Sequence, residues 1–201
     1  MNLNYLFTPT QPLQADPRRQ KAVRFLMWIY VLSVVMIFAG LTSALLVGKA
    51  DLVRNQKWQA FTFPVVFWVS TVVILASSVT LHLAIRAARK NAFQQITSYL
   101  FATTLLAVVF VLCQVLGYFD MVKQGVYLVG SNSGQFLYVI TGAHIAHLVG
   151  GIISLIVMLF RSVRYKIHRE NLMGLELSAT YWHTLDAIWV YLFLFLLQTY
   201  S

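Results

Sequence analysis

Charged residues and cysteines are scarce in this 201-residue sequence. Only 10% of its residues are charged, whereas a soluble domain carries about 25%. The single cysteine, Cys113, excludes an intrachain disulfide, a four-cysteine iron–sulfur site and a two-cysteine copper centre on this chain. Hydrophobic residues make up 59% of the sequence, and the mean hydropathy is +0.72. The composition therefore predicts an integral membrane protein.

Several common functional motifs are also missing. The sequence contains no internal repeat at a fixed period and no low-complexity segment. No Ser/His/Asp triad is recognisable, and the glycine-containing stretch 120–134 does not follow a strand as a phosphate-binding loop would. The sequence therefore gives little support to a hydrolase or a nucleotide-binding protein.

Long apolar segments account for most of the chain. A helix needs roughly 20 apolar residues to span the hydrocarbon core. Five segments meet this length, at about 25–47, 61–85, 97–119, 135–160 and 179–200. The sequence therefore predicts an all-α membrane protein, a bundle of five transmembrane helices in a single domain over residues 24–201. The polar residues 1–23 are predicted to form a retained cytoplasmic arm rather than a signal peptide.

The basic residues are distributed unevenly between the connecting segments. Eleven of the 15 lysines and arginines lie before the first span, after the second and after the fourth: Arg18, Arg19, Lys21, Arg24, Arg86, Arg89, Lys90, Arg161, Arg164, Lys166 and Arg169. By the positive-inside rule, this asymmetry places the N-terminus in the cytoplasm and the C-terminus outside. The formal net charge of +9 is therefore interpreted as a topology signal, and no nucleic-acid partner is expected.

The last span begins beside, and then contains, ionisable residues among aliphatic and aromatic side chains. Glu176, His183 and Asp186 fall within a sector of roughly 80° on one helix face. A charge inside hydrocarbon costs several kcal/mol unless it faces protein or water, so Asp186 must be paired or neutral. Glu176 has two interpretations: a proton-handling carboxylate, or an acid that is stabilised by the helix N-terminus.

The two histidines of the fourth span, His144 and His147, are three residues apart and share a neighbouring helix face. Their depth in the membrane is similar to that of Asp186. We therefore expect His144 or His147 to partner Asp186 or His183 across the fourth and fifth spans, so that no bare charge faces lipid. Histidines in this arrangement can alternatively ligate haem or a metal ion.

Small and hydroxylated residues predict where the helices pack closely. In the fourth span, Gly142, Ala146 and Gly150 recur every fourth residue and predict a stripe on which another helix lies. The second span contains a cluster of small and hydroxyl side chains: Ser70, Thr71, Ala76, Ser77, Ser78 and Thr80. Gln114, one turn before Tyr118 in the third span, needs a hydrogen-bonding partner on another helix. The aromatic residues Tyr181, Trp182, Trp189 and Tyr191 are expected to pack or to lie at the membrane interface rather than to bind a cofactor.

Two motifs resemble those of subunit III of the haem–copper oxidases. The segment TGAHIAHLVGG, from Thr141 to Gly151, is similar to that family's pattern T-G-x-H-x-x-H-x-x-x-G. Glu176, followed by YWHTLDAIW over 181–189, is similar to its pattern E-x4-[YF]-W-H-F-x-D-x-x-W. Supporting similarity lies around Ser77, Ser78 and Thr80 in the second span and at Gln114 and Tyr118 in the third. The resemblance extends from about Arg24 to the C-terminus.

The chain departs from this family's pattern at three points. Many members have seven helices, and this chain corresponds to the last five, as in the short bacterial forms. Members usually carry an intramembrane carboxylate after the serine of the first span, where this chain has Val34. A glutamate is common near Gln114 and Tyr118, where this chain has Gly117. A proton relay through the first-span carboxylate therefore cannot apply to this chain.

The resemblance implies an accessory subunit of a respiratory oxidase that reduces oxygen to water and pumps protons during aerobic electron transport. It implies that the chain carries no catalytic, metal-binding or cofactor-binding residue, and that haem and copper reside in partner subunits. The expected partners are the catalytic subunit I, other oxidase subunits or a respiratory supercomplex, and structural phospholipid. The expected role is to stabilise the catalytic subunit and support proton uptake, and the expected location is the bacterial cytoplasmic (inner) membrane.

Three alternatives remain open from the sequence. The first is the related subunit of a bacterial nitric oxide reductase system, which the helix pattern hardly distinguishes from an oxidase subunit. The second is a haem-binding membrane anchor that uses His144, His147 or His183. The third is a stand-alone carrier, although inverted repeats and broken helices, which are typical of carriers, are not visible in this sequence.

Overall fold

The computed structural model describes residues 17–58, 61–127, 132–167 and 169–200. These residues form five long helices: α1 (Pro17–Arg54), α2 (Val65–Arg89), α3 (Phe93–Lys123), α4 (Asn132–Val163) and α5 (Met173–Tyr200), with a short 3-10 helix η2 (Arg169–Asn171) before α5. All five long helices are long and apolar enough to cross a membrane, and no strand occurs in the described ranges. The predicted all-α, five-helix membrane bundle is confirmed.

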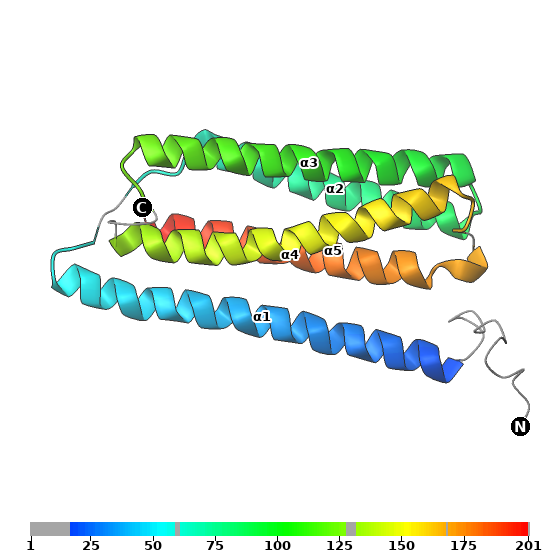
Figure 1. The fold of residues 1–201 in the computed structure, drawn as a ribbon, viewed down its shortest axis with the longest axis horizontal. Coiled ribbons are helices and arrows are strands. Elements are labelled where there is room, and N and C mark those ends of the chain that lie inside the picture. Colours follow the sequence, from blue (N-terminus) through cyan, green and yellow to red (C-terminus); the bar gives the residue numbers. More distant parts are fainter. Residues whose placement is uncertain (1–16, 59–60, 128–131, 168, 201) are drawn as a thin grey trace, which may run out of the picture.

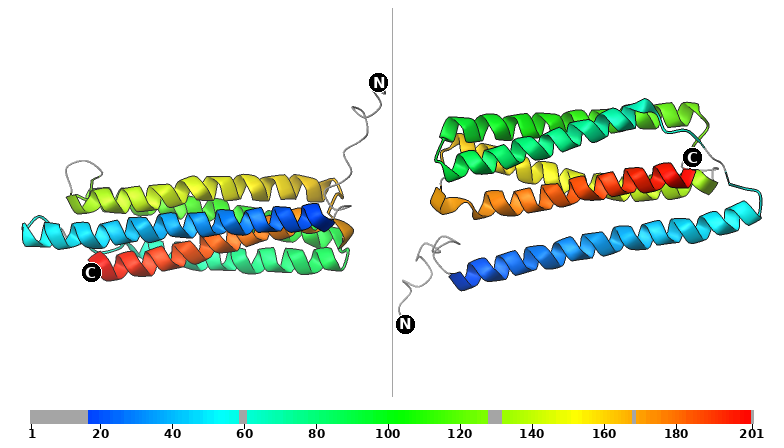
Figure 2. Two further views of the ribbon diagram at one scale, coloured as in Figure 1. Left: turned by 90° about the horizontal axis from the view of Figure 1, so that it is seen from below. Right: turned by 180° about the vertical axis from the view of Figure 1, so that it is seen from behind.

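Helices α2, α3, α4 and α5 form a closed four-helix bundle, and α1 lies outside it (Figures 1 and 2). Within the bundle, each of these four helices contacts two of the others, in the order α2, α3, α4, α5 and back to α2. Helix α1 packs against α4 and α5. Since consecutive helices run in opposite directions, α1 begins and α5 ends at opposite ends of the molecule (Figure 1). The three segments rich in basic residues therefore gather at one end, which we call the basic end.

Helix α5 is the most deeply packed helix, whereas α1 has one narrow contact stripe. Half of the residues of α5 are buried, because α2, α4 and α1 cover different sides of it. The buried residues of α1 recur every three or four positions: Val31, Val34, Phe38, Thr42 and Leu45. This spacing is typical of a helix that packs along a single seam. Val34 is 1% exposed, so a buried apolar side chain stands where the family described in the sequence analysis usually has a carboxylate.

The helices extend beyond the predicted apolar spans. Helix α1 begins at Pro17 and continues to Arg54, so part of the predicted arm is helical, while residues 1–16 of that arm lie outside the described residues. Arginine, lysine and glutamine are good helix formers, so a helix can continue past the apolar region. Proline is favoured in the first helical turn, in agreement with Pro17. Pro64 directly precedes α2 as its N-cap.

The last turns of α1 and the segment after it are attached to the last residues of α5. Lys49 Nζ donates a hydrogen bond to the Thr199 carbonyl and lies 5.0 Å from the centre of the Trp58 ring. Trp58 stacks on Tyr200 with ring centroids 4.8 Å apart. A lysine that binds a carbonyl in the last turn satisfies a group that the helix itself leaves unpaired. These contacts fix α1 to α5 at the end opposite the basic end.

Candidate functional site

Helices α2 and α5 are joined by a row of side-chain hydrogen bonds, which we call the polar seam. It consists of Thr71, Ser77 and Ser78 of α2, which bond to Trp182, His183 and Trp189 of α5, together with Asp186, which lies beside His183. Trp182 Nε1 donates to Ser77 Oγ at 3.0 Å, and Trp189 Nε1 donates to Thr71 Oγ1 at 3.2 Å. The two hydroxyls in turn donate to carbonyls of their own helix. Each indole N–H, which is costly to bury unpaired, is thus satisfied between helices.

His183 and Asp186 lie in the middle of the polar seam. Ser78 Oγ and His183 Nδ1 share a hydrogen bond of 2.6 Å, and His183 Nδ1 is 4.0 Å from Asp186 Oδ2. Asp186 is 4% exposed, and neither of its carboxylate oxygens has a hydrogen-bond partner among the described residues. A hydrolytic triad needs the serine and the carboxylate on different ring nitrogens. Because both groups approach Nδ1, this arrangement is not a Ser/His/Asp triad.

Loss of the Ser78 hydroxyl tests the polar seam. We expect Ser78→Ala to lower the free energy of unfolding in micelles by about 1–2 kcal/mol, because His183 Nδ1 loses its partner. Ser33→Ala is the control, since the exposed Ser33 hydroxyl bonds only its own helix, to the Ile29 carbonyl, and a change within about 0.5 kcal/mol is expected. Equal effects of the two substitutions would show that the bond to His183 contributes no stability.

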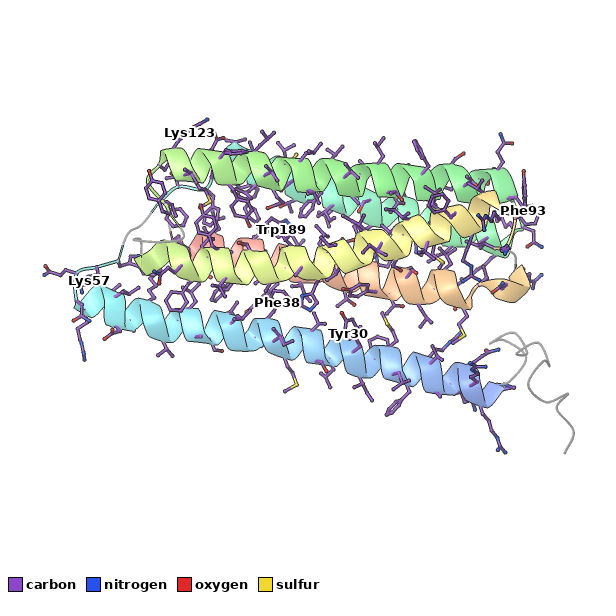
Figure 3. The ribbon with its side chains drawn as sticks, in the orientation of Figure 1. Tyr30, Phe38, Lys57, Phe93, Lys123 and Trp189 are labelled. Carbon is purple, nitrogen blue, oxygen red and sulfur yellow. The ribbon has the colours of Figure 1, made fainter. Side chains whose placement is uncertain are left out.

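The histidines of α4 do not form the predicted bond with Asp186 or His183. His147 Nδ1 donates to the Ala143 carbonyl of its own helix at 2.8 Å. His144 is 1% exposed, and neither of its ring nitrogens has a partner among the described residues. Its ring lies 6.0 Å from Phe38 of α1 and 5.4 Å from Trp189 of α5, between centroids, and Figure 3 labels both aromatic residues. The prediction was wrong because similar depth does not determine which way α4 turns its histidines.

The positions of the histidines also show whether they could ligate a metal ion or haem together. Within the described ranges, no three side chains of His, Cys, Asp or Glu come together as a group that could hold a metal ion. His144 is enclosed by aromatic rings, His147 is bonded to its own helix, and His183 is bonded to Ser78. His144 and His147 both lie beside Phe38 of α1, with ring centroids 6.0 and 5.7 Å away, whereas His183 lies at the contact with α2.

The small-residue stripe of α4 lies on the exposed surface of the bundle rather than beneath a neighbouring helix, and only Gly150 lies near another helix, at the Tyr181 hydroxyl of α5. Gly142, Ala146 and Gly150 are all exposed, and a Cβ added at Gly142 would meet no atom within 4 Å. Gly151 is the glycine at the α4–α5 contact, where an added Cβ would lie 3.0 Å from Leu185 Cδ1 and 3.1 Å from the Trp182 ring. The predicted close approach exists, but it lies one residue from the predicted stripe.

Hydrogen bonds also join α3 to α2. Gln114 Nε2 donates to Ser70 Oγ at 2.9 Å, which supplies the partner on another helix that a buried glutamine needs. Thr80 Oγ1 and Thr103 Oγ1 are 2.8 Å apart. Tyr118, one turn after Gln114, stacks on Tyr138 of α4 with ring centroids 5.6 Å apart. Thr141 donates to the Leu137 carbonyl within α4.

Glu176 lies in the first turn of α5 and contacts two other helices. Its carboxylate oxygens are 3.2 Å from Arg24 of α1 and 3.5 Å from Arg89 of α2. The Glu176 side chain is 31% exposed, whereas Asp186, about 15 Å further along α5, is buried, so the two carboxylates have different environments. The geometry favours the interpretation of Glu176 as an acid of the helix N-terminus that ties α1 and α2 to α5.

Glu176→Gln tests these ion pairs. Since all three side chains are partly exposed, we expect the substitution to lower the free energy of unfolding by about 1 kcal/mol or less. The stability of the wild type should fall from low to high salt, and that of the variant should change less, because salt screens exposed charges. Asp120→Asn is the control, because Asp120 pairs with Lys123 within α3. An unchanged salt dependence in Glu176→Gln would contradict the assignment.

A groove of about 540 Å³ lies between α1 and α5, alongside the polar seam. Its walls are formed by Trp28, Val35, Phe38, Ala39, Thr180, His183, Thr184, Ala187, Ile188 and Tyr191. A smaller pocket of about 150 Å³ contains Arg24 and Glu176 and shares Trp28 and Thr180 with the groove. The two hollows therefore form a path that is apolar at mid-membrane depth and charged at the basic end.

Some contacts of the site were not predicted from the sequence. Tyr30 of α1 donates to Tyr181 at 3.3 Å, and Tyr181 donates to the His147 carbonyl at 2.9 Å, which links α1, α5 and α4. No sequence signal distinguishes Tyr30 from a residue at the membrane interface. The polar seam had a detectable signal, since Trp182 and Trp189 are two helical turns apart, close to the spacing of Thr71 and Ser77.

Comparisons with known proteins give a consistent result. The family described as cytochrome c oxidase subunit III matches residues 14–200. Cytochrome c oxidase subunit 3 of Corynebacterium diphtheriae is 26% identical over 170 residues, which cover 83% of this chain and 82% of that protein. A probable quinol oxidase subunit 3 of Staphylococcus saprophyticus is 27% identical over 168 residues, with 83% coverage of each. Cytochrome c oxidase subunit 3 of Gadus morhua is 31% identical over 197 residues, which cover 89% of this chain and 70% of that protein.

Proposed function

The chain belongs to the cytochrome c oxidase subunit III family, and we propose that it stabilises the catalytic subunit of its oxidase without taking part in electron transfer. It is subunit III of a haem–copper terminal oxidase, and so part of an oxidoreductase complex. The observation that carries the proposal is the polar seam, in which the motif residues Trp182, His183 and Trp189 bond to α2. These residues are used to hold helices together.

The proposal assigns haem, copper and electron transfer to partner subunits. The position of His183 supports this assignment, because it is bonded to Ser78 of α2 while His144 and His147 lie beside Phe38 of α1, and a metal site needs its ligands to converge. The named relatives are cytochrome c or quinol oxidase subunits, which favours an oxidase over a nitric oxide reductase. We propose subunit I as the direct partner, within an assembly that reduces oxygen and pumps protons.

We also propose that the groove between α1 and α5 holds a structural phospholipid. Its mid-membrane walls are largely apolar, and the hydroxyls of Thr180 and Thr184 are satisfied by carbonyls of α5. Its charged end offers Arg24 to a phosphate. If Val35 is replaced by p-benzoylphenylalanine in the purified complex, illumination should crosslink it to phospholipid. A crosslink to another polypeptide would contradict this assignment.

The location and orientation follow from the same proposal. The chain is a multi-pass membrane protein, and we propose that it resides in the bacterial cytoplasmic membrane with its basic end in the cytoplasm. Residues 24–201 then form one membrane domain, and the residues before it form a cytoplasmic arm. The basic end is thereby placed on the side from which the oxidase takes up protons.

Controlled removal of the chain tests the accessory role. We expect the oxidase without this chain to keep its haem spectrum and its initial rate of oxygen consumption, and to lose activity after fewer turnovers. Re-addition of the purified chain should restore the number of turnovers. Loss of haem absorbance in proportion to the removed chain would instead show that the chain carries a redox centre.

A further inference from the structure

Polar atoms without a partner are concentrated at one place inside the four-helix bundle. Six buried side-chain nitrogen and oxygen atoms lack a hydrogen-bond partner within the part of the chain that the structure describes. Two of them belong to Asp186 of the polar seam. The other four are Gln114 Oε1 and the Tyr118 hydroxyl of α3, and both ring nitrogens of His144 on α4. An unpaired buried polar atom is costly, so a group of four such atoms points to a bound molecule.

These four atoms lie close to one level of the contact between α3 and α4. The Tyr118 hydroxyl lies near Thr141 of α4, without a hydrogen bond of good geometry. Gln114 is one turn before Tyr118, and His144 is one turn after Thr141. Because α3 and α4 are antiparallel, both steps lead toward the basic end, and Gln114 and His144 follow as the next neighbours. Both side chains are buried, at 2% and 1% exposure.

The other contacts of Gln114 and His144 complete a layer across the bundle. Gln114 Nε2 donates to Ser70 Oγ of α2. The next residue of α2, Thr71, accepts the indole N–H of Trp189 on α5. The Trp189 ring lies 5.4 Å from the His144 ring of α4, between centroids. These contacts link α3, α2, α5 and α4 in turn, and no hydrogen bond in the described ranges closes the last step, from His144 back to Gln114.

The free atoms at this step include both a donor and acceptors. Ser70 donates its own hydrogen to the Phe67 carbonyl, so it accepts from Gln114 Nε2 and leaves Gln114 Oε1 as an acceptor. A neutral imidazole has one N–H and one bare nitrogen, and a tyrosine hydroxyl can donate or accept. None of the four atoms belongs to a carboxylate or a thiolate. This set suits a neutral molecule that both donates and accepts, and it does not suit a metal cation.

We propose that an ordered water molecule is bound between α3 and α4, where it accepts the N–H of His144 and donates to Gln114 Oε1. The Tyr118 hydroxyl is its third partner, and buried waters typically make about three hydrogen bonds. The water closes the layer that links the four helices. It also gives a structural role to His144, a motif histidine whose ring nitrogens have no direct bond to another described side chain.

A structure of the intact oxidase at a resolution that shows ordered water tests the site. Density for one water should lie within about 3.2 Å of both Gln114 Oε1 and a ring nitrogen of His144. His144→Phe should lose this density, while Gln114 keeps its bond to Ser70. His147→Phe is the matched control, because His147 is bonded to the Ala143 carbonyl of its own helix, and the density should remain. No density in the native chain, a direct bond between Gln114 and His144, or the same result in both variants would overturn the proposal.

A double-mutant cycle measures whether the water couples the two side chains. Gln114→Leu should raise the unfolding equilibrium constant of the purified chain in mixed micelles by roughly tenfold, because the bridge to His144 is lost. In the His144→Phe background the same change should raise it by less than about threefold, since the bridge is already absent. The same factor in both backgrounds would contradict the coupling. These results do not depend on whether haem accompanies the chain, so they are independent of the accessory role.

Discussion

Trp182→Ala is expected to lower the free energy of unfolding by about 3–5 kcal/mol, the range for removing a fully buried aromatic side chain. Trp182 is 0% exposed, and its ring contacts α4 at Gly151. Its indole N–H is bonded to Ser77 of α2. The substitution therefore removes packing between α4 and α5 and a hydrogen bond between α2 and α5 at once. Equilibrium unfolding of the purified chain in mixed micelles measures the loss.

Two further tryptophan variants show which part of the contact matters. Trp182→Phe keeps most of the ring volume and loses the bond to Ser77, so it should cost about 1–2 kcal/mol. Trp68→Ala removes a side chain that is 49% exposed and touches Phe193 edge-on, and it should cost less than about 1.5 kcal/mol. If Trp68→Ala and Trp182→Ala destabilised the chain equally, Trp182 would not be the central contact of α5.

Gly151→Leu is expected to be the second most damaging change, at about 3 kcal/mol. A Cβ at this position already lies within 3.1 Å of two side chains, Leu185 and Trp182, which are both fully buried. A leucine must therefore push α4 away from α5 or force these residues out of their preferred rotamers. The variant should also release the subunit from its complex at lower detergent concentration than the wild type.

The controls for this change come from the same helix. Gly142→Leu adds the same side chain where the structure has open space, and its stability should change by less than about 0.5 kcal/mol. Gly150→Ala should also be tolerated, because its added Cβ would lie 3.4 Å from the Tyr181 hydroxyl. Equal destabilisation by Gly142→Leu and Gly151→Leu would contradict the orientation of α4 described above.

The five spans could be predicted because a membrane helix needs a long apolar segment, and hydropathy records this directly. The ends of the helices could not be predicted in this way, since polar residues such as Arg18 and Lys49 continue α1 beyond its apolar region. Helical periodicity also placed Glu176, His183 and Asp186 on one face of α5, and in the structure His183 Nδ1 lies 4.0 Å from Asp186 Oδ2. It could not reveal that Ser78 on α2 would be the partner of His183.

The errors at α4 have one physical cause. The spacing of Gly142, Ala146 and Gly150 identifies a stripe along the helix, but the rotation of that helix is set by packing of the whole bundle. In the structure, Leu148 and Leu155 turn the neighbouring face inward, so that Gly151 meets α5 and the stripe is exposed. The same rotation places His144 against Phe38 and Trp189 rather than beside Asp186.

The accessory role is tested most directly by purification through a tag on this chain in mild detergent, followed by an optical spectrum of the product. We expect the chain to co-purify with a large haem-bearing subunit, and the haem absorbance to be lost when the chain is separated from it. Haem that remained on the isolated chain would contradict the account, because His144, His147 or His183 would then be ligands rather than parts of a helix bundle.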